Sequence, residues 1–221
     1  MSLITLKNVK KEYGKNQVLF ENLSLEIEKG EFVGLVGKSG AGKTTLLNII
    51  GLITDISEGT IIIDSHQNLS MNSKNAMILR RYTIGYLFQN YGLIEDESVL
   101  WNLKLALEYK KIKKEEKLKL INKYLKQFEL NDMLNKKVYQ LSGGEQQRIA
   151  IIKLILQGSQ VILADEPTSG LDKENELIVM KLLKELNEKG ITIIMVTHNM
   201  NLCDCFSRVI NVENECVKLF L

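Results

Sequence analysis

The sequence predicts an α/β fold in which a parallel sheet carries an N-terminal antiparallel β layer and an inserted helical subdomain. Residues 2–13 and 18–31 alternate apolar and polar side chains with period two, as half-buried strands do. Later apolar runs are followed by segments of helical spacing, which is typical of a parallel sheet. Between these α/β segments, a long stretch rich in Lys and Glu has leucines at helical intervals.

The composition indicates a compact globular chain. Its 221 residues suffice for a buried core, 45% are hydrophobic, and Pro167 is the single proline. With 29 Lys and Arg against 27 Asp and Glu, the formal charge of +2 excludes a global field that would hold nucleic acid or a membrane. No signal-peptide core or membrane-length apolar run occurs, so we expect a cytoplasmic protein.

The N-terminal half supplies the β layer and the first α/β unit. The segments at 2–13 and 18–31 are predicted to be two antiparallel strands. The apolar segment EFVGLVG at 31–37 is predicted to be a buried parallel strand that enters a Gly-rich turn. KTTLLNIIGL at 43–52 continues with helical spacing, so strand, loop and helix follow one another.

The chain from about Trp101 to Leu134 is predicted to be helical. One apolar face of this stretch is expected to consist of Leu103, Leu107, Leu118, Ile121, Leu125 and Phe128. Glutamates interleave with the lysines of 110–126, and no aromatic run accompanies them, so we interpret those lysines as solvated surface rather than a nucleic-acid patch.

The α/β alternation resumes after the helical stretch. VILADE at 161–166 and ITIIMVTH at 191–198 are predicted strands that flank a helix at 172–190, and a short hairpin closes the chain. We therefore expect one domain, residues 1–221. Residues 1–88 and 160–221 would form the core with its β subdomain, and 89–159 the helical subdomain. The three cysteines, Cys203, Cys205 and Cys216, lack the partners of a zinc site and are expected to be reduced thiols.

A phosphate-binding loop is the first functional motif. GKSGAGKT at 37–44 fits G-x-x-x-x-G-K-[ST], whose amides surround phosphate oxygens at a helix N-terminus. Its glycines permit close approach, Lys43 brings a charge to the β/γ-phosphates, and the Thr44 hydroxyl can ligate Mg²⁺. The motif predicts a P-loop NTPase core but allows a GTPase, a nucleotide kinase or many ATPases. The residues expected to bind nucleotide are Gly37, Lys38, Ser39, Gly40, Ala41, Gly42, Lys43, Thr44 and Thr45.

Two acidic residues narrow the range of enzyme classes that the phosphate-binding loop allows. The buried strand of VILADE brings Asp165 out at its C-terminal end, beside the loop, where a carboxylate can hold Mg²⁺. Glu166 follows and is placed to polarise water for in-line attack on the γ-phosphate. A protein that binds phosphate without hydrolysing it would not need this second carboxylate, so the pair predicts hydrolysis of the bound nucleotide.

A second anion site is predicted in LSGGEQQR at 141–148. Ser142 supplies a hydroxyl, and Gly143 and Gly144 expose amides at the start of the helix that follows. This segment resembles the signature sequence of the ABC ATPase family, and the resemblance spans essentially the whole chain. It implies a head-to-tail dimer that forms on ATP, with each nucleotide between one subunit's P-loop and the other subunit's signature.

The resemblance implies roles for four further residues. Tyr13 occupies the place of the aromatic that stacks on adenine, and Gln89 that of the glutamine that senses Mg²⁺ and the attacking water. His198 is similar to the switch histidine at the γ-phosphate. Asp172 lies in a segment that resembles the loop crossing to the partner subunit, with Gly170 where Ala is commoner. Asp172 also suits the N-cap of the helix that follows.

The resemblance also implies a partner and a location. Members that move solutes work with transmembrane subunits, so we expect a separate permease that holds this chain at the inner face of the plasma membrane, with no nucleic-acid partner. Residues 90–103, after Gln89, are expected to receive an amphipathic helix of that permease. The spacing around LRRYTIGYLFQN at 79–90 is most similar to macrolide-exporter, lipoprotein-releasing and small bacteriocin-export ATPases, which favours export of a peptide or another amphiphile. The alternatives are a soluble ABC ATPase acting on nucleic acid or ribosomes, and a nucleotide-binding regulator without turnover.

Overall fold

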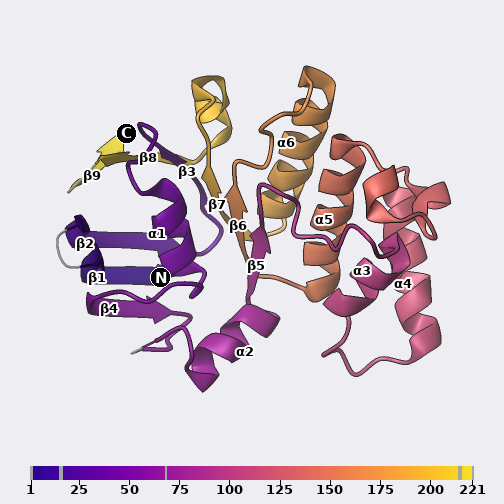
Figure 1. Ribbon diagram of the computed structural model, residues 1–221, viewed down its shortest axis with the longest axis horizontal. Coiled ribbons are helices and arrows are strands. Elements are labelled where there is room, and N and C mark those ends of the chain that lie inside the picture. Colours follow the sequence, from indigo (N-terminus) through magenta and orange to yellow (C-terminus); the bar gives the residue numbers. More distant parts are fainter. Residues whose placement is uncertain (1, 15–16, 68, 214–215, 221) are drawn as a thin grey trace.

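The computed structural model describes residues 2–14, 17–67, 69–213 and 216–220; of 213 and 216–220 it describes the backbone alone. Its strands form two sheets, which lie beside each other in Figure 1. The smaller sheet is antiparallel, in the order β2-β1-β4. Its strands are β1 (Ser2–Tyr13), β2 (Gln17–Glu28) and β4 (Glu58–Ile63).

The larger sheet has six strands in the order β5-β6-β7-β3-β8-β9. The first five in this order are parallel, and β9 pairs antiparallel with β8 at the edge, which confirms the closing hairpin. The bounds are β3 (Phe32–Val36), β5 (Ile84–Leu87), β6 (Val161–Asp165), β7 (Thr192–Val196), β8 (Arg208–Glu213) and β9 (Cys216–Phe220).

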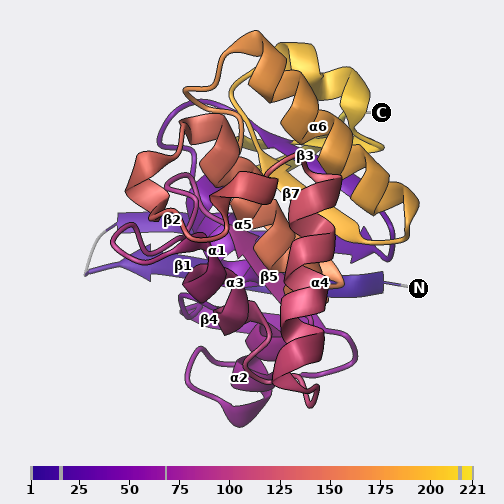
Figure 2. The same cartoon turned by 90° about the vertical axis from the view of Figure 1, so that its right-hand side faces the viewer.

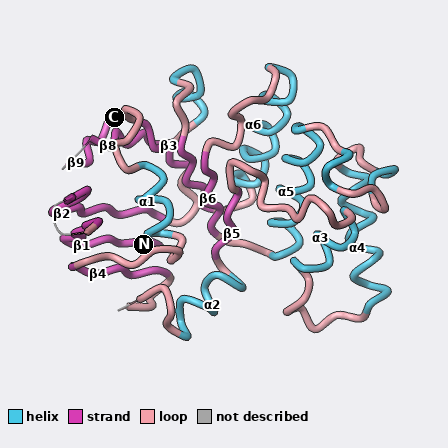
Figure 3. The backbone as a smooth tube through the Cα atoms, in the orientation of Figure 1, coloured by secondary structure: helices cyan, strands magenta, loops and turns pink. Residues whose placement is uncertain are grey.

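Some helices cover the large sheet, and others form a separate group at one side of it. This group faces the viewer in Figure 2. They are α1 (Lys43–Ile50), α2 (Lys74–Tyr82), α3 (Val99–Ala106), α4 (Lys114–Gln127), α5 (Gly143–Gln157) and α6 (Lys173–Glu188), with 3-10 turns at Asn131–Met133, Val138–Gln140 and Met200–Cys205. The tube in Figure 3 shows α3, α4 and α5 clustered beyond β5. Within the described residues, no helix has both the length and the apolar character that a membrane crossing requires.

The two faces of the large sheet contribute to two separate cores. In β6, Val161 and Leu163 pack with α1 and the antiparallel sheet, whereas Ile162 and Ala164 pack with the helices of the other face. β7 alternates in the same way, as the period of a strand requires. Because both faces are covered, the central strands β3, β6 and β7 are largely apolar. The α1 helix therefore lies on one face of the sheet, and α5 and α6 lie on the other.

The predicted fold class is confirmed, and three details differ. The helical stretches predicted from Trp101 to Leu134 are present as α3 and α4, but residues 107–113 between them are not helical. Leu118 is not buried with the apolar face: it is 39% exposed, whereas Leu103, Ile121 and Leu125 are buried. The sequence patterns also gave no prediction of β4, α2 or β5. The division into a core and a helical subdomain stays a prediction.

Candidate active site

The predicted phosphate-binding loop joins the end of β3 to the first turn of α1. Gly42 is the N-cap of α1 at φ 92°, a backbone conformation that favours glycine, and makes no side-chain cap. A Cβ at this position would lie 2.7 Å from Cζ of Phe20, so the antiparallel sheet closes off the space. Lys38, Ser39 and Gly40 are exposed. The loop therefore exposes backbone at a helix N-terminus, where an anion is stabilised, while the Ala41 N–H donates to the Lys38 carbonyl at 3.2 Å.

Lys43 folds back over this loop. Its Nζ donates hydrogen bonds to the carbonyl oxygens of Gly37 and Lys38, each at 2.8 Å, and the residue is 5% exposed. Burial lowers the pKa of Lys43, against the opposing effect of the nearby Glu166 and Asp165. The ammonium is thus held inside the loop by carbonyl groups, at the point where phosphate oxygens are expected.

Thr44 and Asp165 meet where the loop faces the end of β6. The Thr44 hydroxyl donates to Oδ1 of Asp165 at 3.1 Å. Burial raises the pKa of Asp165, and the Thr44 bond counteracts part of this effect. A hydroxyl and a carboxylate are hard oxygen donors that suit Mg²⁺. No group of three or more His, Cys, Asp or Glu in the described residues fits a metal, so Mg²⁺ here would take its other ligands from phosphates and water.

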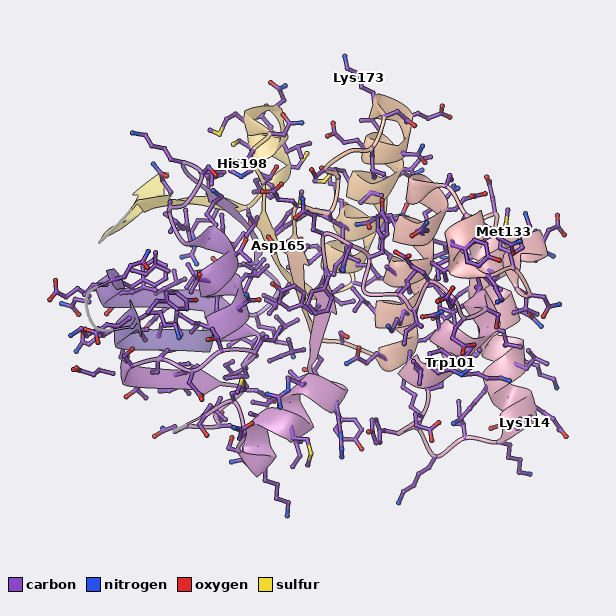
Figure 4. The ribbon with its side chains drawn as sticks, in the orientation of Figure 1. Trp101, Lys114, Met133, Asp165, Lys173 and His198 are labelled. Atoms are coloured by element: carbon purple, nitrogen blue, oxygen red, sulfur yellow. The ribbon has the colours of Figure 1, made fainter. Side chains whose placement is uncertain are left out.

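Glu166 and His198 form a pair beside Asp165. His198 Nε2 lies 2.8 Å from Oε1 of Glu166. Glu166 has φ 48°, rare for a residue other than glycine, and its N–H donates to the carbonyl of Val196 at 3.1 Å. The backbone thereby turns sharply out of β6 and directs this carboxylate toward the end of β7. Figure 4 shows Asp165 and His198 at the same end of the central sheet.

A small pocket of about 200 Å³ adjoins this pair and holds a second carboxylate that the sequence motifs did not reveal. Glu166, His198, Asn199 and Glu176 are among its lining residues. Glu176 accepts a hydrogen bond from the side-chain amide of Asn199 at 3.2 Å, so α6 is tied to the loop of His198. The only sequence signal for Glu176 would have been its position in the predicted helix, four residues after Asp172.

Gln89 and Tyr13 approach the site from two edges. Leu87, the last residue of β5, pairs with Ala164 of β6. Gln89 therefore lies two residues beyond the carboxyl end of β5, at the end of the sheet where Asp165 lies, and Gln89 is exposed. The Tyr13 hydroxyl lies 3.4 Å from Oγ1 of Thr45, and the ring is 45% exposed. Lys11 Nζ lies over one face of this ring, 4.7 Å from its centroid.

Ser142 caps α5 and takes part in a capping box with Glu145. Its Oγ accepts from the Glu145 N–H at 3.4 Å and donates to Oε2 of the same residue at 2.8 Å, and its own N–H bonds that carboxylate at 2.7 Å. Burial acts to raise the pKa of Glu145, yet the net shift is downward because of these bonds. The amides of Gly143 and Gly144 remain free of intrahelical partners, as at any helix N-terminus.

Asp172 caps α6 and connects this helix to the start of α5. Its two carboxylate oxygens accept from the backbone N–H and the side-chain amide of Asn175, both at 2.8 Å, and these bonds lower the pKa of Asp172. Asn175 in turn lies against Gly144 so closely that a Cβ on Gly144 would overlap its Oδ1. The N-cap that the sequence allowed for Asp172 is therefore present.

Gly144→Ala is expected to lower the free energy of unfolding by about 1–3 kcal/mol, because the new methyl group displaces Asn175 from its bond with Asp172. Urea unfolding of the variant checks this. The double variant Gly144→Ala/Asn175→Ala should recover much of the loss. If the double variant is no more stable than the single one, the packing explanation is wrong.

The predicted residues thus form two groups. Lys43, Thr44, Asp165, Glu166 and His198 meet at one end of the large sheet. Ser142 belongs to α5, which packs on the opposite sheet face from α1 and the phosphate loop (Figure 1). Within one chain, the two predicted anion sites are therefore presented by helices on opposite sides of the sheet.

Comparisons with known proteins fit this geometry. A family model described as "ABC transporter" matches residues 20–169. The chain is 41% identical over 212 residues to the macrolide export ATP-binding/permease protein MacB of Campylobacter jejuni, an alignment that covers 96% of this chain and 33% of that protein. It thus spans about a third of that relative's length. It is also 40% identical over 215 residues to the ABC transporter ATP-binding protein MJ1508 of Methanocaldococcus jannaschii, covering 96% of each.

A solved structure gives the same picture of the fold. The dimeric post-hydrolysis state of the ATP-binding cassette MJ0796, bound to ADP and Pi, aligns with a TM-score of 0.88 and 38% identity. The alignment covers 97% of this chain and 96% of that one.

Proposed function

Since the chain belongs to the ABC transporter family, whose cassettes are ATP-hydrolysing transporter subunits, we propose that two copies close on two ATP molecules and drive a separate membrane permease. The enzyme class is ATPase. The cargo we propose is a peptide, a bacteriocin or another amphiphilic compound that is exported. The location we propose is the cytoplasmic face of the membrane, reached through the permease alone.

One observation carries the dimer proposal. The phosphate loop and its acidic residues are assembled in one chain, but the amides at Ser142 lie on the other face of the sheet. A triphosphate bound at the loop would therefore leave its outer side uncovered unless a second copy supplied them. The dimeric state of the similar cassette MJ0796 supports this arrangement.

The proposed chemistry follows from the residues at the loop. Lys43 and the loop amides neutralise the phosphates, and Glu166 takes a proton from the attacking water while His198 holds its carboxylate in place. Thr44, Asp165 and Gln89 are the residues that would hold Mg²⁺, which would supply charge stabilisation to the phosphates when bound. Tyr13 stacks on the base, and Asp172 reaches the partner subunit.

The export proposal rests on the relatives. The similar protein MacB is named for macrolide export and carries a permease as well as an ATP-binding part, and this chain spans about a third of it. The described residues contain no membrane-crossing helix. We propose that a permease partner contacts the surface beside Gln89. Reconstitution with the permease encoded by a neighbouring reading frame tests this, because transport should then depend on ATP.

Lys43→Ala is expected to weaken nucleotide binding at least about tenfold, because it removes a buried charge at the phosphates. Titration with a fluorescent ATP analogue measures the change, and Lys43→Arg serves as a partner variant that keeps the charge. A thermal melt confirms that the fold is retained. Unaltered affinity in Lys43→Ala would show that the loop is not the nucleotide site.

A further inference from the structure

Lys11 is a buried lysine beside Tyr13 that the proposed chemistry does not use. It precedes Tyr13 by two residues on β1 and is 8% exposed. Its Nζ lies 4.7 Å from the centroid of the Tyr13 ring, a distance at which a cation is attracted to the face of an aromatic ring. A charged group is seldom buried in this way unless it has partners that stabilise it.

The partners of the Lys11 ammonium are uncharged. Its Nζ donates to the carbonyl of Asp55 at 2.7 Å and to the hydroxyl of Thr54 at 3.2 Å. In the part of the chain that the structure describes, no carboxylate lies within salt-bridge distance of it. An ammonium has three N–H donors, so these two bonds leave one for the face of the Tyr13 ring. Because the cation is largely removed from water, its attraction to the ring is stronger than at an open surface.

The elements that hold the Tyr13 ring are all connected to α1, the helix that follows the phosphate loop. The Tyr13 hydroxyl lies 3.4 Å from Oγ1 of Thr45, in the first turn of α1. The loop that binds Lys11 is tied to the same helix, since the Ile53 N–H donates to the Asn48 carbonyl at 2.9 Å. The ring is therefore fixed relative to the phosphate loop at its hydroxyl edge and at one face.

The face of Tyr13 opposite Lys11 is the one available to a ligand. Tyr13 is 45% exposed although Lys11 is almost covered, so the lysine lies on the protein side of the ring. A base that stacks on the outer face would complete a sandwich of ammonium, ring and base. A ring that is already held in place loses less conformational freedom when the base binds, which increases affinity.

We propose that Lys11 is a positioning residue for the nucleotide base, and that its ammonium holds the Tyr13 ring from behind so that the base stacks on the outer face. This role rests on the proposed function, in which Tyr13 stacks on the base, and deepens it by naming the group that orients the ring. Lys11 should therefore contribute to the binding of the nucleoside part and not to the binding of the phosphates.

ADP and inorganic pyrophosphate separate these two contributions. Both present two phosphates to the loop, but only ADP carries a base. Calorimetric titration of the full chain with each compound, in the presence of Mg²⁺, gives the two dissociation constants. For Lys11→Met, which keeps most of the apolar stem, we expect the affinity for ADP to fall about fivefold and that for pyrophosphate to stay within about twofold of the wild type.

Two further variants show whether Lys11 acts through the ring. Lys10→Met is the matched control, because Lys10 Nζ pairs with Oε1 of Glu12 at 2.6 Å and not with a ring, and it should bind both compounds as the wild type does. Tyr13→Leu should itself lower the affinity for ADP about tenfold. Lys11→Met should then cause no further loss in the Tyr13→Leu background, since no ring is left to hold.

The inference would be overturned by any of four results. Equal losses for ADP and pyrophosphate in Lys11→Met would mean a structural role alone, and an unaltered affinity for ADP would mean no role. The full fivefold loss in the Tyr13→Leu background would mean that Lys11 does not act through the ring, and wild-type affinity in Tyr13→Leu itself would mean that the ring does not stack. Each of these with intact ATP hydrolysis leaves the ATPase proposal standing, whereas wild-type protein that binds neither compound would remove the proposed function.

Discussion

Glu166→Gln is expected to lower the turnover of ATP at least about a hundredfold while nucleotide binding persists. The amide has nearly the size of the carboxylate and still accepts a hydrogen bond from Nε2 of His198, so the sharp turn at φ 48° and the pocket remain intact. What is lost is the basic oxygen that takes a proton from water. ATP then stays between the two copies, and a dimer should accumulate that gel filtration detects with ATP but not with ADP.

Glu174→Gln is the matched control for this prediction. Glu174 lies in the first turn of α6, two residues before Glu176. Unlike Glu166 and Glu176, it is exposed and does not line the 200 Å³ pocket at His198. The control should hydrolyse ATP at the wild-type rate. Wild-type turnover in Glu166→Gln itself would remove the assigned role of this carboxylate.

The parts of the site that the sequence revealed are those in which neighbours in the chain act together. The phosphate loop and the helix that follows it consist of consecutive residues. Gly42, Lys43 and Thr44 can therefore be recognised from the local sequence motif alone. The Ser142 cap is equally local, because a serine followed three residues later by Glu145 is a capping box. Strand ends such as Asp165 follow from the apolar run before them.

The parts that the sequence did not reveal depend on which elements the fold brings together. Glu176 joins the site only because α6 packs beside the end of β7, and nothing near it in the chain indicates Asn199 as its partner. Gln89 reaches the carboxyl end of the sheet near Asp165 only because β5 pairs with β6, and β5 had not been predicted. Leu118 had the periodicity of a core residue and lies on nearly the same face of α4 as the buried Leu125, but it is near the start of that helix and is 39% exposed.

Ser142→Asp is expected to prevent the ATP-dependent dimer while leaving the nucleotide affinity of a single copy within about twofold of the wild type. Aspartate still accepts the Glu145 N–H at the start of α5, although the bond that Ser142 Oγ donates to Oε2 of Glu145 is lost. The added carboxylate would face the γ-phosphoryl group of the partner's nucleotide, where like charges are unfavourable by several kcal/mol. We expect dimerisation to weaken at least about a hundredfold, equivalent to about 2.7 kcal/mol.

The measurement uses a Glu166→Gln background, in which dimers accumulate, and compares Ser142→Asp with Ser142→Asn. Asparagine also caps a helix but carries no charge, so it should retain far more of the dimer. Titration of dilute protein with a fluorescent ATP analogue reports the single copy, and gel filtration with ATP reports the pair. If Ser142→Asp weakens binding by the single copy, the signature belongs to its own subunit's site. If the dimer forms as before, Ser142 faces solvent, and the second copy is not what completes the site.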